Sequence, residues 1–420
     1  MRIMAQFLDE DWVIAGDDYC NLVDEDDLSH KDDCGSEENF TQSSDLDFDD
    51  DVDLPGFQSV AVQWVPENED IFFEKIKRRE DMTIEDIVRE HSLPFLPAKS
   101  LVRFRSVCKN WDEWIRNPFL AHKQTNCFRN FSGLFRQSTD GFCSFISLNR
   151  AAYDVASPDL TFLPESVYIR SSCSGLLCCQ GRSGDHTYYI CNPVNMEWIA
   201  LPQPNLYHGS EPAVVLAFDP STLNFAADYD LVCAIPPIDS PIHCFEIYSS
   251  RTGSWRVSDT VCCEEDVLNL NSCGFYMKGV AYWETLSTGK VLAFDMKHEH
   301  YGVLELPDGV GTLAEMRGEL CYIQAYPNAQ YSCVVDIYGV ADLGLNQRIV
   351  LPNAVRETYE HCRVLPCINS NILVILAGGK TIAYYVKDHK VVQLRSYGDL
   401  RATYWPYVNS LVHITSGPET

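Results

Sequence analysis

Hydrophobic and polar residues follow two different periods along the chain, one before residue 131 and one after it. In the stretch SLVRFRSVCKNWDEWI, large apolar residues recur at intervals of three and four: Leu101, Phe104, Val107 or Cys108, Trp111, and Trp114 or Ile115. This spacing lines one side of a helix or of a closely bent helix pair. We therefore predict a small all-helical domain over residues 71–130, with its core at 83–120.

Such a domain is too small to cover all its apolar side chains. Pro97 suits the first turn of a helix, where its missing N–H is not needed, and Asn117-Pro118 suits a helix end. A helical unit of about forty residues removes too little surface from water to bury two tryptophans and so many aliphatic side chains by itself. Its apolar side must meet either the domain that follows or a second polypeptide, and the spacing alone leaves both open.

From Phe131 onward, short alternating or wholly apolar runs are separated by Gly, Pro, Asn, Asp and Ser, a pattern typical of an all-β domain. One phrase recurs, in which an apolar strand, a polar turn and a second strand follow one another. Its copies end at Pro164, Pro202, Asp259, Pro307, Pro352 and Ser396. The intervals between these ends are 38, 57, 48, 45 and 44 residues, which leaves room for two further strands per copy, such as 213–219 and 371–379.

Four strands per repeat is the arrangement of a β-propeller blade. Six copies predict a mainly β protein with about six blades over residues 131–410 and a short tail at 411–420, although five or seven blades also fit because the outer copies are degenerate. Within the phrases, Trp198 and Trp255 are expected to pack between neighbouring blades. Asn192-Pro193 is expected to begin a turn.

Acidic residues are concentrated at the start of the chain. Residues 1–70 hold 22 Asp or Glu against Arg2 and Lys31, which accounts for −20 of the formal net charge of −28. Because this stretch has no sustained period, we expect a disordered acidic tail. A chain this negative repels phosphate backbones, so no nucleic-acid partner is expected.

The sequence also indicates the cellular compartment in which the protein is expected. No apolar run reaches signal-peptide or membrane-spanning length, so we expect no secretion and no membrane partner. The 18 cysteines are scattered and include no Cys-x-x-Cys pair. They are therefore expected to be reduced thiols in a cytoplasmic or nuclear protein.

Motifs of enzymes are missing from the sequence: it has no Gly-x-Ser-x-Gly, no His-Glu-x-x-His and no phosphate loop. His298-Glu299-His300 is expected to be a hairpin tip and Gly378-Gly379-Lys380 a β-turn. Asp219 and Asp295 are expected to cap strand ends instead of forming a catalytic pair. We therefore expect a protein without catalytic residues, cofactor or metal.

The stretch LPAKSLVRFRSVCKNW closely resembles the F-box motif. The matching residues are Leu96, Pro97, Lys99, Ser100, Leu101, Arg103, Phe104, Arg105, Val107, Cys108, Lys109 and Trp111. An F-box usually opens with Leu-Pro-x-Asp, whereas here Thr83-Ile84 precede Glu85-Asp86 and the spacing to Leu96-Pro97 is one residue longer. The resemblance implies a three-helix module that docks on a Skp-type adaptor of a cullin-based (SCF) ubiquitin ligase and shares an apolar core with it.

By the same resemblance, the adaptor-binding residues are Leu96, Pro97, Leu101, Phe104, Val107, Cys108 and Trp111, of which Trp111 supplies internal packing. Further phrases resemble the F-box-associated, kelch-like domain of plant F-box proteins over roughly residues 140–400: Ser174 to Cys178, Asn192-Pro193 to Pro202, Ala217 to Pro220, Phe245 to Tyr248 with Trp255, and Gly279 to Trp283 with Phe294-Asp295. In that family the second domain generally recruits a protein to be ubiquitinated.

The expected function is therefore that of a non-catalytic substrate-recognition subunit of an SCF-type ubiquitin ligase, in which the F-box binds the adaptor and through it a cullin, and the propeller binds a client protein. The alternative is a propeller that binds or hydrolyses a small molecule or glycan, with the helical segment as structural packing. The client is not evident from the sequence. Loops 203–212 and 235–243 are candidate contacts only because they are expected to be exposed.

Overall fold

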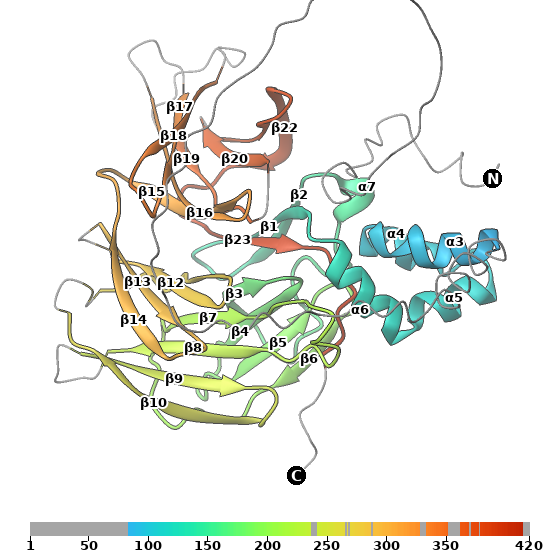
Figure 1. Cartoon of the computed structure of the whole chain (residues 1–420), viewed down its shortest axis with the longest axis horizontal. Coiled ribbons are helices and arrows are strands. Elements are labelled where there is room, and N and C mark those ends of the chain that lie inside the picture. Colours follow the sequence, from blue (N-terminus) through green and yellow to red (C-terminus); the bar gives the residue numbers. More distant parts are fainter. Residues whose placement is uncertain are drawn as a thin grey trace, which may run out of the picture. The chain divides into compact units, whose positions relative to one another are not determined.

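The computed structural model describes residues 83–414 except for positions 237–241, 265–266, 268, 287–288, 328–332, 352–361, 369–370 and 378. The acidic tail expected over residues 1–70 lies outside the described residues. Helices come first along the described chain and strands follow, so the fold is mainly β, as predicted (Figure 1).

The helices between residues 83 and 127 form what we call the helical module. It consists of α3 (Ile84–His91), the 3-10 turn η1 (Leu93–Phe95), α4 (Ala98–Phe104), α5 (Lys109–Arg116) and α6 (Pro118–Cys127). The predicted helix end at Asn117-Pro118 is confirmed, because Asn117 is the C-cap of α5. Asn117 also begins α6: its side chain accepts a hydrogen bond from the backbone N of Phe119 at 2.8 Å.

Five four-stranded sheets follow one plan, in which consecutive strands pair antiparallel. They are β3 (Val167–Cys173), β4 (Leu176–Gly181), β5 (Tyr188–Asn192) and β6 (Glu197–Ala200); β7 (Ala213–Ala217), β8 (Asp230–Ile235), β9 (His243–Ser249) and β10 (Ser254–Cys262); β11 (Phe275–Met277), β12 (Val280–Glu284), β13 (Lys290–Asp295) and β14 (His300–Glu305); β15 (Gly311–Met316), β16 (Glu319–Pro327), β17 (Cys333–Gly339) and β18 (Leu345–Val350); β19 (Cys362–Val364), β20 (Ile372–Ala377), β21 (Lys380–Tyr385) and β22 (Lys390–Tyr397). The apolar runs at 213–219 and 371–379 are thus confirmed as further strands, β7 and β20.

The sixth sheet joins the two ends of the β domain. It consists of β1 (Phe131–Gln137), β2 (Cys143–Ser147) and β23 (Thr403–Val408) in the order β2-β1-β23. β23 pairs antiparallel with β1, with Phe131 opposite Val408, so the last strand closes the ring on the first. The structure is a six-bladed β-propeller, which confirms the predicted fold and blade number.

Apolar side chains fill the spaces between neighbouring blades. Val214 and Leu216 of β7, for example, pack with Cys178 and Ile190 of the preceding blade. Strands β4, β5 and β7 are buried along their whole length, which explains why they read as continuous apolar runs without alternation. Another cluster joins β1, β2 and β23 to the blades of β15–β18 and β19–β22.

The two phrase tryptophans differ in their surroundings. Trp255 is buried between two blades, and its Nε1 donates to the carbonyl oxygen of Pro202 at 2.8 Å, which confirms its expected role. For Trp198 the prediction is wrong: its side chain is 43% exposed, and its ring meets that of Tyr189 of the same sheet edge to face. Both tryptophans lie on the outermost strand of their blade, but Trp255 packs against Tyr188 and His208, whereas Trp198 is at an exposed position of β6.

The first copy of the phrase, which ends at Pro164, does not form the expected hairpin. It contains β2, the short helix α7 (Arg150–Tyr153) and a segment without strands that leads to β3. β2 is the outer edge of the closing sheet, whose inner strand comes from the C-terminal part of the chain. After β2 the chain crosses to the next blade through α7 and this segment, and the closing sheet has three strands instead of four.

Candidate functional site

The helical module begins with a capping box. The Thr83 side chain accepts a hydrogen bond from the backbone N of Asp86 at 3.2 Å, and the Asp86 carboxylate accepts one from the backbone N of Thr83 at 3.2 Å. Hydrogen bonds from Thr83 hold the pKa of Asp86 below its ordinary value. The departure from the usual F-box opening thus forms a regular helix start.

Two kinds of contact set the angle between α4 and α5. The rings of Phe104 and Trp111 meet edge to face with their centroids 5.5 Å apart. The Asp112 carboxylate accepts hydrogen bonds from Arg105 Nε and Arg116 Nε, each at 2.8 Å, and these two guanidinium groups lower its pKa. The groups are partly exposed, so their main effect is on geometry and little of the stability depends on them.

The module has an apolar core of its own. Leu93, Leu101 and Ile115 are buried in it together with Leu120, and half-buried Trp111 and Trp114 pack against its rim. Leu411, which lies beyond the closing strand β23, belongs to the same core. The helical module is therefore completed by a residue from the other end of the described chain.

Polar contacts made by α6 hold the module to this C-terminal segment. Gln124 Oε1 accepts a hydrogen bond from the backbone N of Leu411 at 3.0 Å, and its Nε2 donates to the carbonyl oxygen of Leu96 at 3.3 Å. The Thr125 hydroxyl lies 2.9 Å from that of Ser410. Gln124 and Thr125 are buried, so their polar groups cannot bond to water, and these hydrogen bonds take the place of hydrogen bonds to water.

Two side chains of the module, those of Lys99 and His122, and that of Arg129 just after it contact carbonyl groups of the propeller. Lys99 Nζ donates to the carbonyl oxygen of Arg150 at 2.7 Å and pairs with Asp154 at 3.1 Å. Arg129 donates to the carbonyl oxygen of Pro220 at 2.5 Å, and His122 Nε2 lies 2.8 Å from that of Ser221. One side of the module is thus attached to the propeller. This is what we expected for the alternative in which the helical segment serves as structural packing.

The residues implied as an adaptor site lie at three depths. Pro97 and Leu101 are buried, Leu96, Phe104 and Trp111 are half-buried, and Val107 and Cys108 are exposed. The side chain of Leu101 is fully enclosed in the module's own core, so it contributes to the stability of the module. Of the seven, Val107 and Cys108 are the ones open to a second polypeptide without rearrangement, and their role as adaptor contacts stays a prediction.

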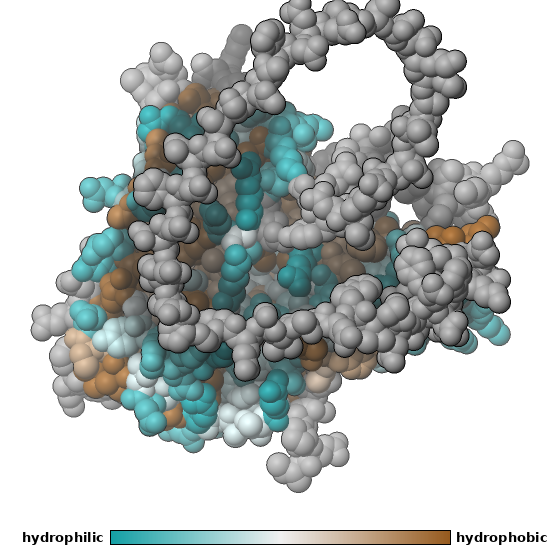
Figure 2. Space-filling view, viewed as in Figure 1, coloured by the Kyte–Doolittle hydropathy of each residue, from teal (hydrophilic) through white to brown (hydrophobic). Residues whose placement is uncertain are grey.

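Other apolar side chains of the module are exposed as well, and the motif did not single them out. Val102 of α4 is 41% exposed, close to the 50% of Val107, and it lines a depression of about 680 Å³ along α4 and α5 together with Cys108. Ile84 and Ile87 are exposed and lie three residues apart, on one side of α3. Figure 2 shows hydrophobic residues, in brown, at the right-hand end, where the helical module lies. In the sequence, the spacing of three between Ile84 and Ile87 in the stretch TIEDI was the signal that could have indicated this exposed apolar side.

The loop at 203–212 lies at the opposite end of the sheets from the helical module. The β5–β6 turn meets the C-terminal segment, where Asn195 Nδ2 donates to the carbonyl oxygens of Leu411 at 3.2 Å and Val412 at 3.0 Å. Strand β6 runs away from that turn, so the loop that follows it emerges at the other end. For the second candidate loop, residues 237–241 lie outside the described part of the chain.

A buried carboxylate holds the loop at 203–212 in place. Glu246 accepts hydrogen bonds from the backbone N atoms of Asn205 at 2.8 Å and Leu206 at 3.0 Å, and lies 2.9 Å from His208 Nε2. Burial lowers the pKa of His208, which favours a neutral ring that donates to Glu246. Between these anchors the side chain of Tyr207 is exposed, so the loop presents an aromatic ring on a fixed backbone.

The remaining candidate positions have structural roles. Asp295 ends β13 and accepts hydrogen bonds from the backbone of the following turn and from His298, which lowers its pKa to about 2. His298 and Glu299 lie in that turn, as expected, and Glu299 pairs with Arg256 of the neighbouring blade. Within the described residues, no group of three or more His, Cys, Asp or Glu side chains could hold a metal ion, and no helix has the length and apolar character to cross a membrane.

Comparisons with known proteins find F-box proteins among the chains that this one is similar to. Residues 144–341 match the family model described as the β-propeller of F-box protein At3g26010-like. Among curated proteins of Arabidopsis thaliana, F-box protein At5g07610 is 29% identical over 59% of this chain and 64% of its own length, and F-box protein At5g49610 is 30% identical over 51% and 62%. The chain thus spans less than two thirds of either relative. A chain in the crystal structure of a nidogen/laminin complex aligns with 15% identity and a TM-score of 0.41, over 66% of this chain and 99% of that one.

The fold defines a six-bladed β-propeller protein with an N-terminal helical module. The helical module carries the F-box-like stretch, and the propeller matches a domain of F-box proteins. The chain is thus similar to plant F-box proteins, and the similarity to their family model lies in the β-propeller.

Proposed function

We propose that this chain is the substrate-recognition subunit of an SCF-type ubiquitin ligase. The observation that carries the proposal is that the helical module is attached to the propeller and still exposes apolar side chains. Lys99, Gln124 and, just after the module, Arg129 bind the propeller and its C-terminal segment. Val102 and Val107 are exposed and form apolar surface that a Skp-type adaptor can cover.

In this proposal the propeller binds a client protein and the adaptor links the complex to a cullin. Loop 203–212 supports a client-binding role for the end of the sheets away from the helical module, because Glu246 fixes its backbone while Tyr207 is exposed. A loop that is already ordered loses less conformational entropy when a partner binds. The protein performs no chemistry of its own and acts by holding the client near the transferring enzyme, which raises the effective concentration.

The test is the affinity of purified chain for a purified Skp-type adaptor, measured by calorimetry. We expect the double variant Val102→Asp, Val107→Asp to bind at least about tenfold more weakly, because each change puts a charge into an interface that excludes water. Both side chains are exposed, so the variant should unfold at the same urea concentration as the wild type. Val310→Asp is the matched control, since Val310 is 90% exposed on the propeller.

Unchanged affinity in the double variant, or equal weakening in Val310→Asp, would refute the proposal. Leu101 is unsuitable for this purpose, since it belongs to the core of the module and its substitution changes folding and binding together.

A further inference from the structure

An exposed apolar surface lies where α6 meets the β7–β8 loop. Phe119 of α6 and Phe225 of the loop have ring centroids 5.8 Å apart, and the His122 ring lies 4.9 Å from that of Phe225. Both phenylalanines are more than half exposed, and Leu223 of the same loop is 96% exposed. We call Phe119, Leu223 and Phe225 the junction patch. Contiguous exposed apolar side chains from two parts of a chain are typical of a binding surface.

The loop that carries the patch is rigidly folded around one amide side chain. Asn224 Nδ2 donates to the carbonyl oxygens of Asp228 at 2.8 Å and Asp219 at 3.3 Å, and Asn224 Oδ1 accepts from the backbone N of Asp228 at 2.8 Å. The contacts of His122 and Arg129 with the loop carbonyls hold its other side. Leu223 is therefore exposed on an ordered backbone, and little further ordering opposes the binding of a partner.

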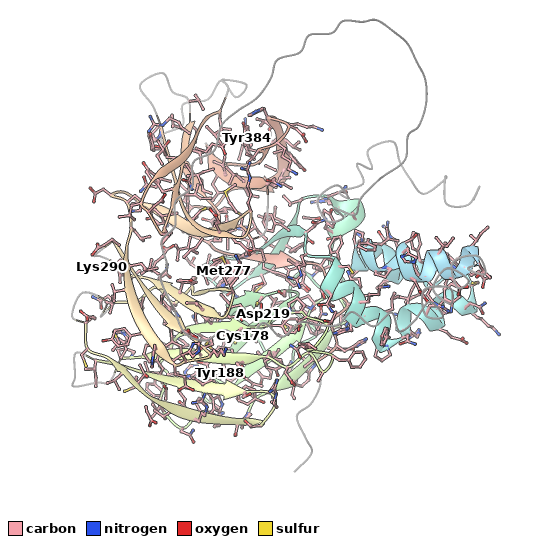
Figure 3. All side chains as sticks on the ribbon, in the orientation of Figure 1. Cys178, Tyr188, Asp219, Met277, Lys290 and Tyr384 are labelled. Carbon is pink, nitrogen blue, oxygen red and sulfur yellow. The ribbon has the colours of Figure 1, made fainter. Side chains whose placement is uncertain are left out.

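A negatively charged hollow of about 420 Å³ borders the patch. Leu223 forms part of its wall, and the other lining groups include the carboxylates of Asp219, Asp228 and Asp230. Arg251 is the one cation among the lining residues; it pairs with Asp228 at 3.1 Å, and its side chain is 77% exposed. Three carboxylates against one guanidinium leave the hollow negative. Asp219, labelled in Figure 3, accepts a hydrogen bond from the Tyr276 hydroxyl at 2.5 Å.

We propose that the junction patch and this hollow together bind a peptide segment in which an aromatic or aliphatic residue stands a few positions from a lysine or arginine. The apolar side chain packs on Leu223 and Phe225, and the cation enters the hollow near Asp219. Opposite charge selects the basic residue, and the apolar contact supplies the area removed from water. The junction patch and the hollow include neither Val102 nor Val107, the proposed adaptor contacts.

Three fluorescein-labelled peptides test the proposal by fluorescence anisotropy: GSGFSKKSGS, its acidic counterpart GSGFSEESGS, and GSGASKKSGS without the aromatic residue. We expect the first to bind the full chain at least about tenfold more tightly than either of the others at low salt, and its affinity to fall as salt rises. Equal affinity for all three peptides, or no binding of any, would overturn the proposal.

Two variants locate the site. Asp219→Asn keeps an acceptor for the Tyr276 hydroxyl and removes one charge, so it should reduce the preference for the basic peptide over the acidic one. Leu223→Ser should reduce the preference for the aromatic peptide, and it removes no packing because Leu223 is almost fully exposed. Val310→Ser is the control, because Val310 is also almost fully exposed but is not part of the proposed site. If the first two variants bind the peptides as the control does, the site is elsewhere and the proposal fails.

Discussion

Replacing Leu411 with alanine tests whether the segment after the closing strand completes the core of the helical module. Leu411 is 5% exposed and packs with Leu93, Leu101, Ile115 and Leu120. The change removes about three carbon groups, which corresponds to about 2.4 kcal/mol at roughly 0.8 kcal/mol per buried methylene. The cavity that remains raises the cost, so we expect the helical module to lose about 3 kcal/mol of unfolding free energy.

Hydrogen exchange followed by mass spectrometry separates this effect from the stability of the propeller. A loss of about 3 kcal/mol should speed exchange of amides in α4 and α5 by roughly a hundredfold, while amides of β4 and β5 exchange as in the wild type. Leu345→Ala is the matched control, because Leu345 is 47% exposed on β18 and its truncation should cost less than about 0.5 kcal/mol. Faster exchange confined to the propeller, with α4 and α5 unchanged, would refute the assignment of Leu411 to the core of the module.

Three further substitutions test other parts of the structure. Gln124→Ala should lower the unfolding free energy by about 1–3 kcal/mol in a urea titration, because the backbone N of Leu411 and the carbonyl oxygen of Leu96 lose their buried partner; a change below about 0.5 kcal/mol would contradict this. Trp255→Ala should cost about 3–5 kcal/mol and Trp198→Ala less than about 1 kcal/mol, so equal urea midpoints would count against the two placements. Burial lowers the pKa of His208 below its ordinary value of 6.5. Between 6.5 and this lowered pKa, the unfolded chain binds a proton at His208 that the folded chain does not, so the unfolding free energy decreases as the pH falls below 6.5. Urea titrations at pH 7 and pH 5.5 should show a smaller decrease for His208→Gln than for the wild type, and parallel decreases would exclude this role.

The apolar spacing was sufficient to predict the elements that bury one continuous face. Leu101, Trp111 and Ile115 follow a helical period and lie in or against one core, and the repeated two-strand phrase corresponds to the outer hairpins of five blades. The sixth blade has a different origin, since β23 pairs with β1 across almost the whole β domain. A pairing between residues so far apart in sequence leaves no local pattern.

Helix α6 and Trp198 are two features that the hydrophobic pattern does not predict. α6 docks through Gln124 and Thr125, which are polar residues that a hydrophobic pattern assigns to solvent. Trp198 and Trp255 occupy equivalent places in the repeated phrase, but only for Trp255 do Tyr188 and His208 pack against the ring, and Trp198 is exposed. Periodicity shows which side of an element is apolar, and it does not show which neighbour covers that side.

For the candidate site the same limit applies to Leu101 and Val107. Both belong to the F-box-like stretch, yet one is enclosed by the module and the other is half exposed. Sequence spacing alone does not separate them, because the turn between α4 and α5 and the insertion of Leu411 decide which side chains the module covers itself.

Site-specific photocrosslinking shows whether a Skp-type adaptor covers the apolar surface of the helical module around Val107, which is exposed in the structure. Benzoylphenylalanine is incorporated in place of Val107, an exposed valine of the helical module. As the control, it is incorporated in place of Val310, an exposed valine of the propeller. We expect a covalent adduct with purified adaptor from position 107 and none from position 310. Adducts from position 310 alone, or none from position 107 while the adaptor is bound, would contradict it.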